Sequence, residues 1–288
     1  MAAFDFLFVG FLACLVLVGI HGYLGIHVLA RGVIFVDIAL AQIAALGSTV
    51  AFLRGNPLDS GTAWAYSVGF TFAAAALFAL SRNLRERVPQ EAIIGVAYAT
   101  CAALTLMLVE MAPNGAQHIK DLLVGSIDFV TLEHVRNTAI VYGLIGAFQY
   151  AFRKKFITLS FDHDAPEAKT RSAMLWDLAF YMSFGLVITM SVQVAGVLLV
   201  FCFLIVPSVF AAMFAEKIST RLAIAWTLGF VVSALGIFFA YESKNWLPQT
   251  EGLPTGPTVV ATFGAALLLA FAVRRIFRRW LGGQVVRA

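Results

Sequence analysis

One acidic residue, Asp37, lies within a strongly apolar stretch of the chain, residues 31–50, whose sequence is RGVIFVDIALAQIAALGSTV. A carboxylate near the centre of a membrane helix costs roughly 2.5–3.5 kcal/mol on insertion scales. We therefore expect Asp37 to face protein or water, and we take it as a functional candidate together with Gln42. A structural hydrogen bond to another helix is the alternative role. Small residues follow at helical spacing, which predicts a tightly packed interior helix: Ala41, Ala44, Ala45, Gly47 and Ser48.

Other polar groups in apolar segments could mark a route for a cation. Two histidines, His21 and His27, precede Asp37, and the remaining groups lie further along the chain: Glu91, Asp177 and Gln193. Imidazole together with carboxylate suits zinc, manganese or ferrous iron better than sodium or calcium. Each histidine could instead be a packed or interfacial residue.

A second candidate for cation binding lies in the connection between residues 112 and 135. Its apolar residues have helical spacing, so we expect an interfacial helix there. His118 and Asp121 would share one face of that helix and could form an outer entry point for a metal ion. A solvated histidine beside an acid is the simpler interpretation.

The elements that must position these groups are membrane-spanning helices. The chain has 288 residues, 61% hydrophobic and only 12% charged, with a mean hydropathy of +0.88, which is far outside the range of soluble domains. We expect an all-α polytopic membrane protein with about eight or nine spans in one transport domain, residues 1–288. The predicted spans lie near residues 4–24, 33–53, 62–81, 90–111, 136–152, 176–194, 197–214, 221–241 and 257–277. Polar residues between the sixth and seventh leave open two short helices or one broken helix.

Basic residues divide unevenly between the two sides of this predicted bundle. Only four of the 20 lysines and arginines fall in the outer connections: Arg54, Lys120, Arg136 and Lys244. The positive-inside rule then places the N-terminus outside and the C-terminus in the cytoplasm. The basic residues thus indicate topology and contact with anionic membrane lipid, and nothing in them indicates nucleic-acid binding.

The longest cytoplasmic connection, residues 153–175, is expected to contain a short helix in its middle. Asp164 could cap this helix, Pro166 suits its first turn, and Glu167 with Arg171 would form an i,i+4 pair. Such a helix could simply lie on the surface between spans. It could also dock on a cytoplasmic motor protein and transmit movement, and the residues alone leave both roles open.

Enzymatic motifs are missing from the sequence. No glycine is followed by lysine, so the nucleotide-binding loop G-x-x-x-x-G-K-[ST] is absent and the chain should not hydrolyse ATP itself. The five histidines lack the H-E-x-x-H context, and there is no G-x-S-x-G elbow. Cys14, Cys101 and Cys202 are too widely spaced in the sequence to indicate a zinc site or a redox pair. Transport is therefore the leading class of function.

Four blocks of the sequence resemble the permease subunits of bacterial ATP-binding-cassette (ABC) importers for zinc, manganese and iron. They are LGIHVLARGVIFVDIALAQIAALG (24–47), EAIIGVA (91–97), LLVGSID (122–128) and VAGVLLVFCFLIVPSVFAA (194–212). The resemblance implies a multi-pass subunit of the bacterial inner membrane with no permanently bound cofactor. It also implies a second copy of the permease as partner, cytoplasmic ABC ATPases that bind the ATP, and an external solute-binding protein.

The resemblance further implies roles for individual residues. The metal would be handed down between the two halves beside His21, His27, Asp37 and Gln42. The segment around residues 161–175 matches the place of the helix that docks on the ATPase, which implies these coupling residues: Phe161, Asp162, Ala165, Glu167, Ala168 and Arg171. Gln193, Gly196 and Pro207 would shape the pathway in the last block.

The second span departs from the family pattern. Better-known members carry an Asp and, four residues later, a His; here Gln42 takes the position of that His. Asp37 then falls one residue early and lies about 140° from Gln42 around an ideal helix. This branch would use a different ligand set, such as His27 with Asp37, or would bind its ion more weakly, since glutamine is a poor zinc ligand.

The expected function is import of a divalent transition metal ion, with zinc favoured and manganese or iron as alternatives. Hydrolysis of ATP on the partner subunit would drive it. The same fold could instead import a metal chelate, which the missing histidine would favour. An ATP-independent secondary transporter or channel is the alternative from another class.

Overall fold

A computed structural model describes residues 2–58, 60–84, 87–111, 127, 130–162, 165–166, 170–246 and 252–285 of the chain, with the backbone alone at 2–6, 83–84, 171 and 276–285. Within these ranges the regular structure is helical and contains no strand. In chain order the elements are α1 (Ala2–Arg31), α2 (Val36–Leu53), α3 (Gly61–Leu80), the short 3₁₀ helix η1 (Ser81–Leu84), α4 (Gln90–Glu110), α6 (Leu132–Ala151), α7 (Arg153–Phe161), α8 (Arg171–Phe214), α9 (Ile218–Trp246) and α10 (Thr255–Val285).

The described helices have the lengths that membrane spans require. Seven of them are long and apolar enough to cross a bilayer: α1 to α4 and α8 to α10. The 44-residue α8 consists of two helices joined at a kink, and the less apolar α6 adds a further 20-residue helix. The prediction of an all-α polytopic membrane protein is confirmed; counting the two halves of α8 separately and adding α6 to the seven candidates gives nine helices among the described residues for the eight or nine spans predicted.

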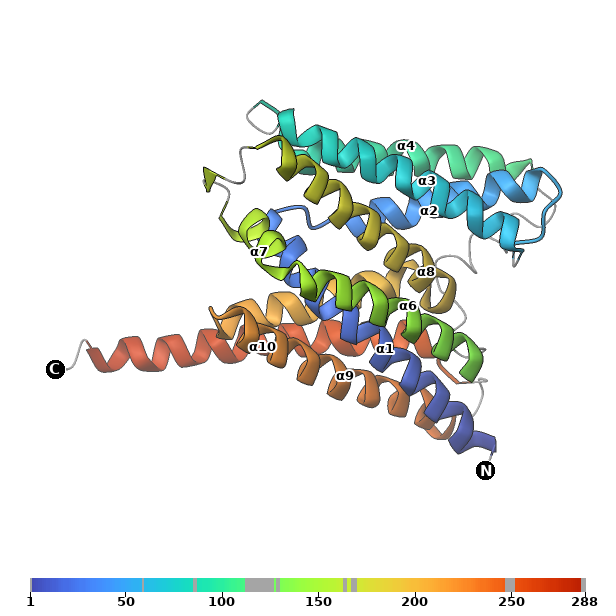
Figure 1. Cartoon of the computed structure of the whole chain (residues 1–288). Helices are drawn as coiled ribbons and strands as arrows, with labels where there is room; N and C mark the ends of the chain where they lie inside the picture. The colour runs from blue at the N-terminus through green and yellow to red at the C-terminus, as the bar shows by residue number, and fades with distance from the viewer. Residues whose placement is uncertain are drawn as a thin grey trace.

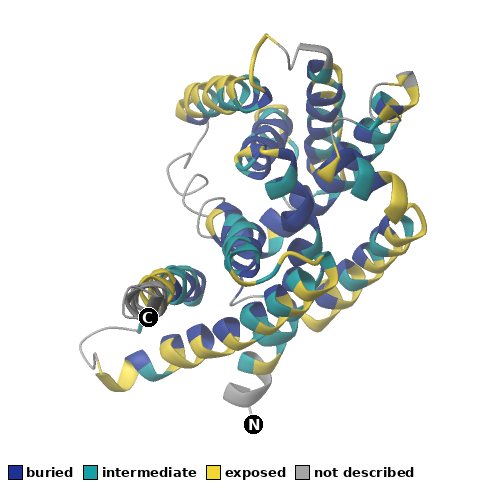
Figure 2. Cartoon of the chain, turned by 90° about the vertical axis from the view of Figure 1, so that its left-hand side faces the viewer, coloured by how far each residue is buried: buried dark blue, intermediate teal, exposed yellow. Residues whose placement is uncertain are grey.

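The helices lie side by side along one axis, and their ends gather at the two ends of the bundle (Figure 1). One of these contains α7, the end of α1 and the start of α2, and we call it the α7 end. The first helix begins at the far end, whereas α10 finishes beyond the α7 end. Viewed from the α7 end, buried positions face one another between the helices and exposed positions line their outward sides (Figure 2).

The kink in α8 lies at Gly196, where φ is 73° and ψ is 164°. Only glycine adopts this backbone conformation readily. The contacts of α8 with α1 show that the chain reverses there. Before the kink, Asp177 pairs with Arg31 and Ser191 lies 3.3 Å from His21, so this half runs antiparallel to α1. After the kink the chain runs back along α1, because Leu204 and Ser208 pack against Gly25.

These contacts identify residues 171–195 and 197–214 as two antiparallel spans joined directly at Gly196, as in the first of the two alternatives left open by the sequence. A longer loop between the two spans is not needed, because Gly196 reverses the chain in a positive-φ conformation.

The most enclosed span is α2. In its apolar 18-residue segment 72% is buried, compared with 17% in the corresponding segment of α4. A Cβ atom added at Gly47 would lie 2.8 Å from the carbonyl oxygen of Tyr66 on α3, so the small residues of α2 allow backbone to approach backbone. The prediction of a tightly packed interior helix is confirmed.

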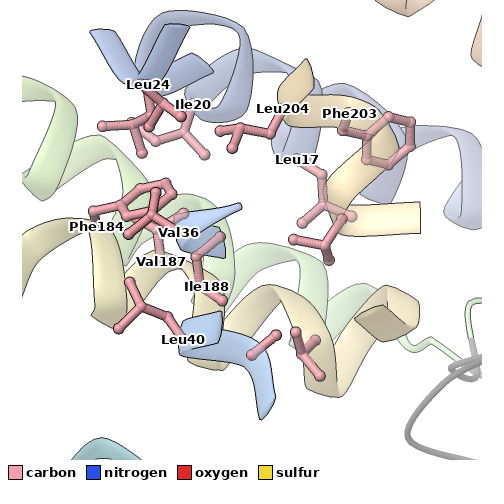
Figure 3. Packing of buried hydrophobic residues seen from close by; sticks show 14 of the residues in the cluster. Leu17, Ile20, Leu24, Val36, Leu40, Phe184, Val187, Ile188, Phe203 and Leu204 are labelled. Atoms are coloured by element: carbon pink, nitrogen blue, oxygen red, sulfur yellow. The ribbon is translucent and has the colours of Figure 1, made fainter. Parts of the chain in front are cut away.

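The main hydrophobic core joins α1, α2 and both halves of α8 (Figure 3). Aliphatic residues of α1 and α2 and aromatic residues of α8 fill it, including Leu17, Leu24, Val36, Leu40, Phe184, Ile188 and Phe203. The core therefore surrounds the helix that carries Asp37.

Candidate functional site

Asp37 lies in the first turn of α2 at the α7 end of the bundle, and its residue is only 1% exposed. Its Oδ1 atom accepts a hydrogen bond of 2.7 Å from the backbone N–H of Ile38. Its Oδ2 atom is buried and has no hydrogen-bond partner among the described residues. Because a buried carboxylate oxygen without a partner is costly, this atom is suited to bind a cation or a proton.

A second carboxyl group, Glu91 in the first turn of α4, lies beside the start of α2. Its Oε1 atom accepts a hydrogen bond of 3.1 Å from the backbone N–H of Phe35, which joins the starts of the two helices. Its Oε2 atom is also buried without a hydrogen-bond partner in the described part of the chain. This hydrogen bond brings the carboxyl group of Glu91 to the first turn of α2, which carries Asp37. We call Asp37 and Glu91 the carboxylate pair.

Two adjacent carboxyl groups repel each other when both are ionised, and a divalent cation between them would relieve that repulsion. Oxygen ligands of this kind suit manganese, magnesium and calcium, and they occur together with imidazole at iron sites. Gln42, five residues after Asp37 on α2, is partly exposed and lies about 140° around the helix from Asp37, so the two side chains do not share a face.

The two predicted histidines are fully buried on α1. His21 contacts the carbonyl oxygen of Leu17 through Nδ1 at 2.7 Å, and its Nε2 lies 3.3 Å from Ser191 Oγ. His27 contacts Ser160 Oγ through Nδ1 at 2.9 Å, and the rings of Tyr23, Phe161 and Phe180 pack against it. Both imidazoles therefore have protein partners on one or both nitrogens.

The alternative ligand set, His27 with Asp37, remains a prediction. No hydrogen bond or ion pair is recorded between the two residues. Nδ1 of His27 contacts Ser160 on α7, and the ring of Phe180 on α8 packs against the imidazole. Across the described ranges, no three residues of the types His, Cys, Asp and Glu lie close enough together to hold a metal ion.

A buried ionic cluster near the carboxylate pair has no counterpart in the sequence analysis. Asp177 on α8 accepts a hydrogen bond of 2.7 Å from Arg31 Nη1 through Oδ1, and its Oδ2 pairs with Arg82 Nη1. Arg31 Nε donates to Ser160 Oγ at 2.9 Å, and the Arg31 guanidinium stacks over the ring of Phe180 at 4.0 Å. Asp177 had been noted only as a polar residue within a span.

We call the residues His27, Arg31, Arg82, Ser160 and Asp177 the Ser160 network. It joins α1, η1, α7 and α8 through contacts between residues 95 to 146 positions apart in the sequence. His27 and Arg31 are four residues apart, so the sequence predicts that they share one face of α1. The neighbouring sequence does not identify the residues that they bind.

The connection that follows α6 differs from the expected arrangement. Residues 153–161 form α7, although the sequence placed a helix only in the middle of this connection. Phe161 and Asp162 are exposed at the end of α7, and Ala165 is partly buried. Arg171, expected to close an ion pair with Glu167 inside a short helix, is instead the first residue of α8. Asp164, Glu167 and Ala168 lie outside the described residues.

A small pocket of about 90 Å³ lies between α7 and the start of α8. It is lined by Lys155, Thr158, Leu159, Thr170, Ser172, Ala173 and Trp176. It adjoins the predicted coupling segment, and its polar rim faces away from the apolar core.

The remaining predicted residues lie apart from the carboxylate pair. Gln193 is exposed near the kink at the far end, Gly196 forms that kink, and Pro207 is buried within the second half of α8. His118 and Asp121, the predicted outer entry point, lie outside the described residues, as does most of the predicted interfacial helix.

The sequence profile of the ABC 3 transport family matches residues 3–274, which is most of the chain. The chain belongs to the ABC 3 transport family. The resemblance noted from the four sequence blocks is thereby confirmed, and the chain is a multi-pass permease of the bacterial inner membrane, a transport component of an ABC system and not itself catalytic.

Curated members of this family are similar to the chain over most of its length. The probable iron transport system membrane protein of Haemophilus influenzae is 24% identical over 255 residues, 88% of this chain and 84% of that protein. The manganese transport system membrane protein MntC of Listeria innocua is 24% identical over 223 residues, 77% of each chain.

A solved structure shares the fold. PsaBC from Streptococcus pneumoniae in complex with Fab superposes with a TM-score of 0.73 at 21% identity, covering 92% of this chain and 91% of that chain. The bundle therefore shares the fold of that solved structure.

Proposed function

We propose that this chain is the permease subunit of an ATP-driven importer of a divalent transition metal ion. The observation that carries the proposal is the carboxylate pair: the buried Asp37 and the partly buried Glu91 each have one buried oxygen without a partner among the described residues, in the most enclosed of the seven apolar helices and in its neighbour. Membership of the ABC 3 transport family supports the transport role. The printed names of the relatives, which mention iron and manganese, support a metal as cargo.

The two unpartnered oxygens of the carboxylate pair suit manganese and ferrous iron. Three histidine nitrogens contact Leu17, Ser160 and Ser191, but the buried Nε2 atom of His27 has no recorded hydrogen-bond partner within the described ranges, and imidazole nitrogen is a ligand that zinc prefers. The preference for zinc drawn from the sequence remains a prediction, and a direct comparison of the three metals would decide it. A metal chelate would need no histidine ligand and is the second cargo to be compared.

The proposed complex contains two copies of this chain, cytoplasmic ABC ATPases and an external solute-binding protein. The α7 end would face the cytoplasm, because Arg31, Arg82 and the basic start of α7 gather there. The segment from Phe161 to Arg171 would dock on the ATPase. The carboxylate pair would then lie on the cytoplasmic side of the pathway, where cargo is released.

Vesicles that contain the permease and its ATPase would test the proposal by uptake of radioactive manganese, ferrous iron and zinc. Asp37→Asn should reduce uptake to background, and Glu91→Gln should reduce it strongly, because each loses a charged ligand without changing shape. Glu110→Gln, an exposed site at the other end of α4, is the matched control and should transport normally.

Full uptake by Asp37→Asn would remove the carboxylate pair from the mechanism. Uptake of metal only when it is supplied as a chelate would identify the chelate as cargo. Uptake by the permease alone under a proton gradient would instead identify an ATP-independent transporter.

A further inference from the structure

The Ser160 network lies between the predicted docking segment and the carboxylate pair. Ser160 is the last residue but one of α7, and the connection to α8 starts two residues later. Its side chain is fully buried and contacts both His27 and Arg31 on the last turns of α1. Phe161 packs its ring against His27 as well, at 6.0 Å between ring centroids. Two successive residues of α7 are thus attached to α1.

Ser160 Oγ accepts a hydrogen bond from Arg31 Nε, because a guanidinium nitrogen can only donate. Ser160 Oγ also lies 2.9 Å from Nδ1 of His27, and the tautomer of the imidazole decides which of these two atoms donates. Removing the hydroxyl would leave a buried guanidinium nitrogen and a buried imidazole nitrogen without this partner.

The network continues from Arg31 to the starts of the two helices that carry the carboxylate pair. Arg31 ends α1, and Asp37 follows six residues later. Asp177 joins Arg31 to Arg82 in η1, the element that precedes α4 and Glu91. The hydrogen bond from the Phe35 N–H to Glu91 closes the circuit between α2 and α4. Hydrogen bonds and ion pairs thus connect Ser160 through Arg31 and Asp177 to η1, and the chain leads from Arg31 to Asp37 in six residues.

The route is stiff enough to transmit movement. Phe156 anchors α7 against Trp176 and Phe180 of α8, with ring centroids 5.7 and 6.1 Å apart. The side chains of Arg31 and Asp177 are 1% and 4% exposed, so water does not screen their ion pair. Buried ion pairs add little to stability compared with apolar residues, and their best attested role is to specify one arrangement.

We propose that Ser160 is a positioning residue that, through Arg31 and Asp177, transmits movement of the end of α7 to the Asp37–Glu91 carboxylate pair. This proposal rests on the proposed function, because it assumes that an ATPase acts on the α7 end of the permease. Without the hydroxyl group of Ser160, ATP hydrolysis would continue but would no longer move the carboxyl groups.

The test is the ratio of metal transported to ATP hydrolysed, measured in the same vesicles with manganese as cargo and the ATPase subunit of this importer. Ser160→Ala should lower that ratio at least about fivefold while hydrolysis stays within about twofold of the unaltered complex. Arg31→Lys should act in the same direction, because lysine keeps the charge opposite Asp177 but cannot also donate from a second nitrogen to Ser160. Ser160→Thr, which keeps the hydroxyl, should restore the ratio.

Thr158→Ala is the matched control, since its hydroxyl lies on the same helix but bonds only to its own helix at Lys154. The proposal is wrong if Ser160→Ala and Arg31→Lys keep the ratio of metal transported to ATP hydrolysed found in the unaltered complex. A merely structural role of Ser160 would give this result, because it would lower transport and hydrolysis in equal proportion. Failure of the unaltered complex to transport any metal would instead contradict the proposed function. The two failures are therefore distinguishable.

Discussion

Gly25 of α1 packs directly against the second half of α8, and replacing this glycine by alanine tests that packing. An added Cβ would lie 2.1 Å from the carbonyl oxygen of Leu204 and 2.3 Å from Ser208 Oγ. The serine side chain can rotate away, but the carbonyl belongs to the backbone. The two helices would have to separate by about 1 Å to accept the methyl group.

Overpacking of a well-packed interior costs about 1–3 kcal/mol, and the backbone contact places Gly25→Ala at the upper end, about 3 kcal/mol. For a chain of this size, about 2–4 °C of melting temperature is lost per kcal/mol, so we expect a decrease of about 6–12 °C. Fluorescence-detected thermal unfolding of the purified permease in detergent measures this change.

Gly19→Ala is the control on the same helix, because no heavy atom lies within 4 Å of its added Cβ. It should leave the melting temperature unchanged or raise it, since alanine is the better helix former by about 1 kcal/mol. Equal melting temperatures for the two variants would refute the close approach of α1 and α8, and with it the reversal of α8 at Gly196.

Three further predictions concern separate parts of the bundle. Asp177→Ala leaves two buried or partly buried guanidinium groups without their carboxylate, so it should destabilise the permease by about 3–5 kcal/mol, seen as a lower melting temperature and yield. Gly196→Ala should lower the free energy of unfolding by about 1–3 kcal/mol because of the positive φ at the kink. Gly143→Ala, with open space around its added Cβ, is the control and should not lower it; equal effects of the two substitutions would place the reversal of the chain elsewhere. Gln42→His should increase uptake of zinc relative to manganese in competition experiments, because it adds an imidazole ligand on α2; an unchanged ratio would exclude Gln42 from the pathway.

The spans could be predicted from the sequence because each depends on local composition. Apolar runs of about 20 residues must form hydrogen-bonded helices in a bilayer, which determined their number and approximate ends. The interior position of α2 could also be predicted, since small residues at helical spacing accompany Asp37. The burial of Asp37 followed from the cost of exposing a carboxylate to lipid.

The Ser160 network could not be predicted, because its partners come from four elements far apart in the chain. Ser160 is one serine in a basic segment and carries no local signal, and α7 itself is too polar to be distinguished from a connection by hydropathy. Glu91 was noted as a polar group, but its proximity to Asp37 depends on how α2 and α4 pack. The exposed position of Gln193 depends on the same packing.

The central claim is that the carboxyl group of Asp37 holds the transported metal. Binding of manganese to the purified permease, followed by electron paramagnetic resonance of the free ion, tests it without the ATPase. We expect a saturable site in the unaltered chain that is lost in Asp37→Asn and kept in Glu110→Gln. Equal binding of manganese by Asp37→Asn and the unaltered chain would contradict the claim.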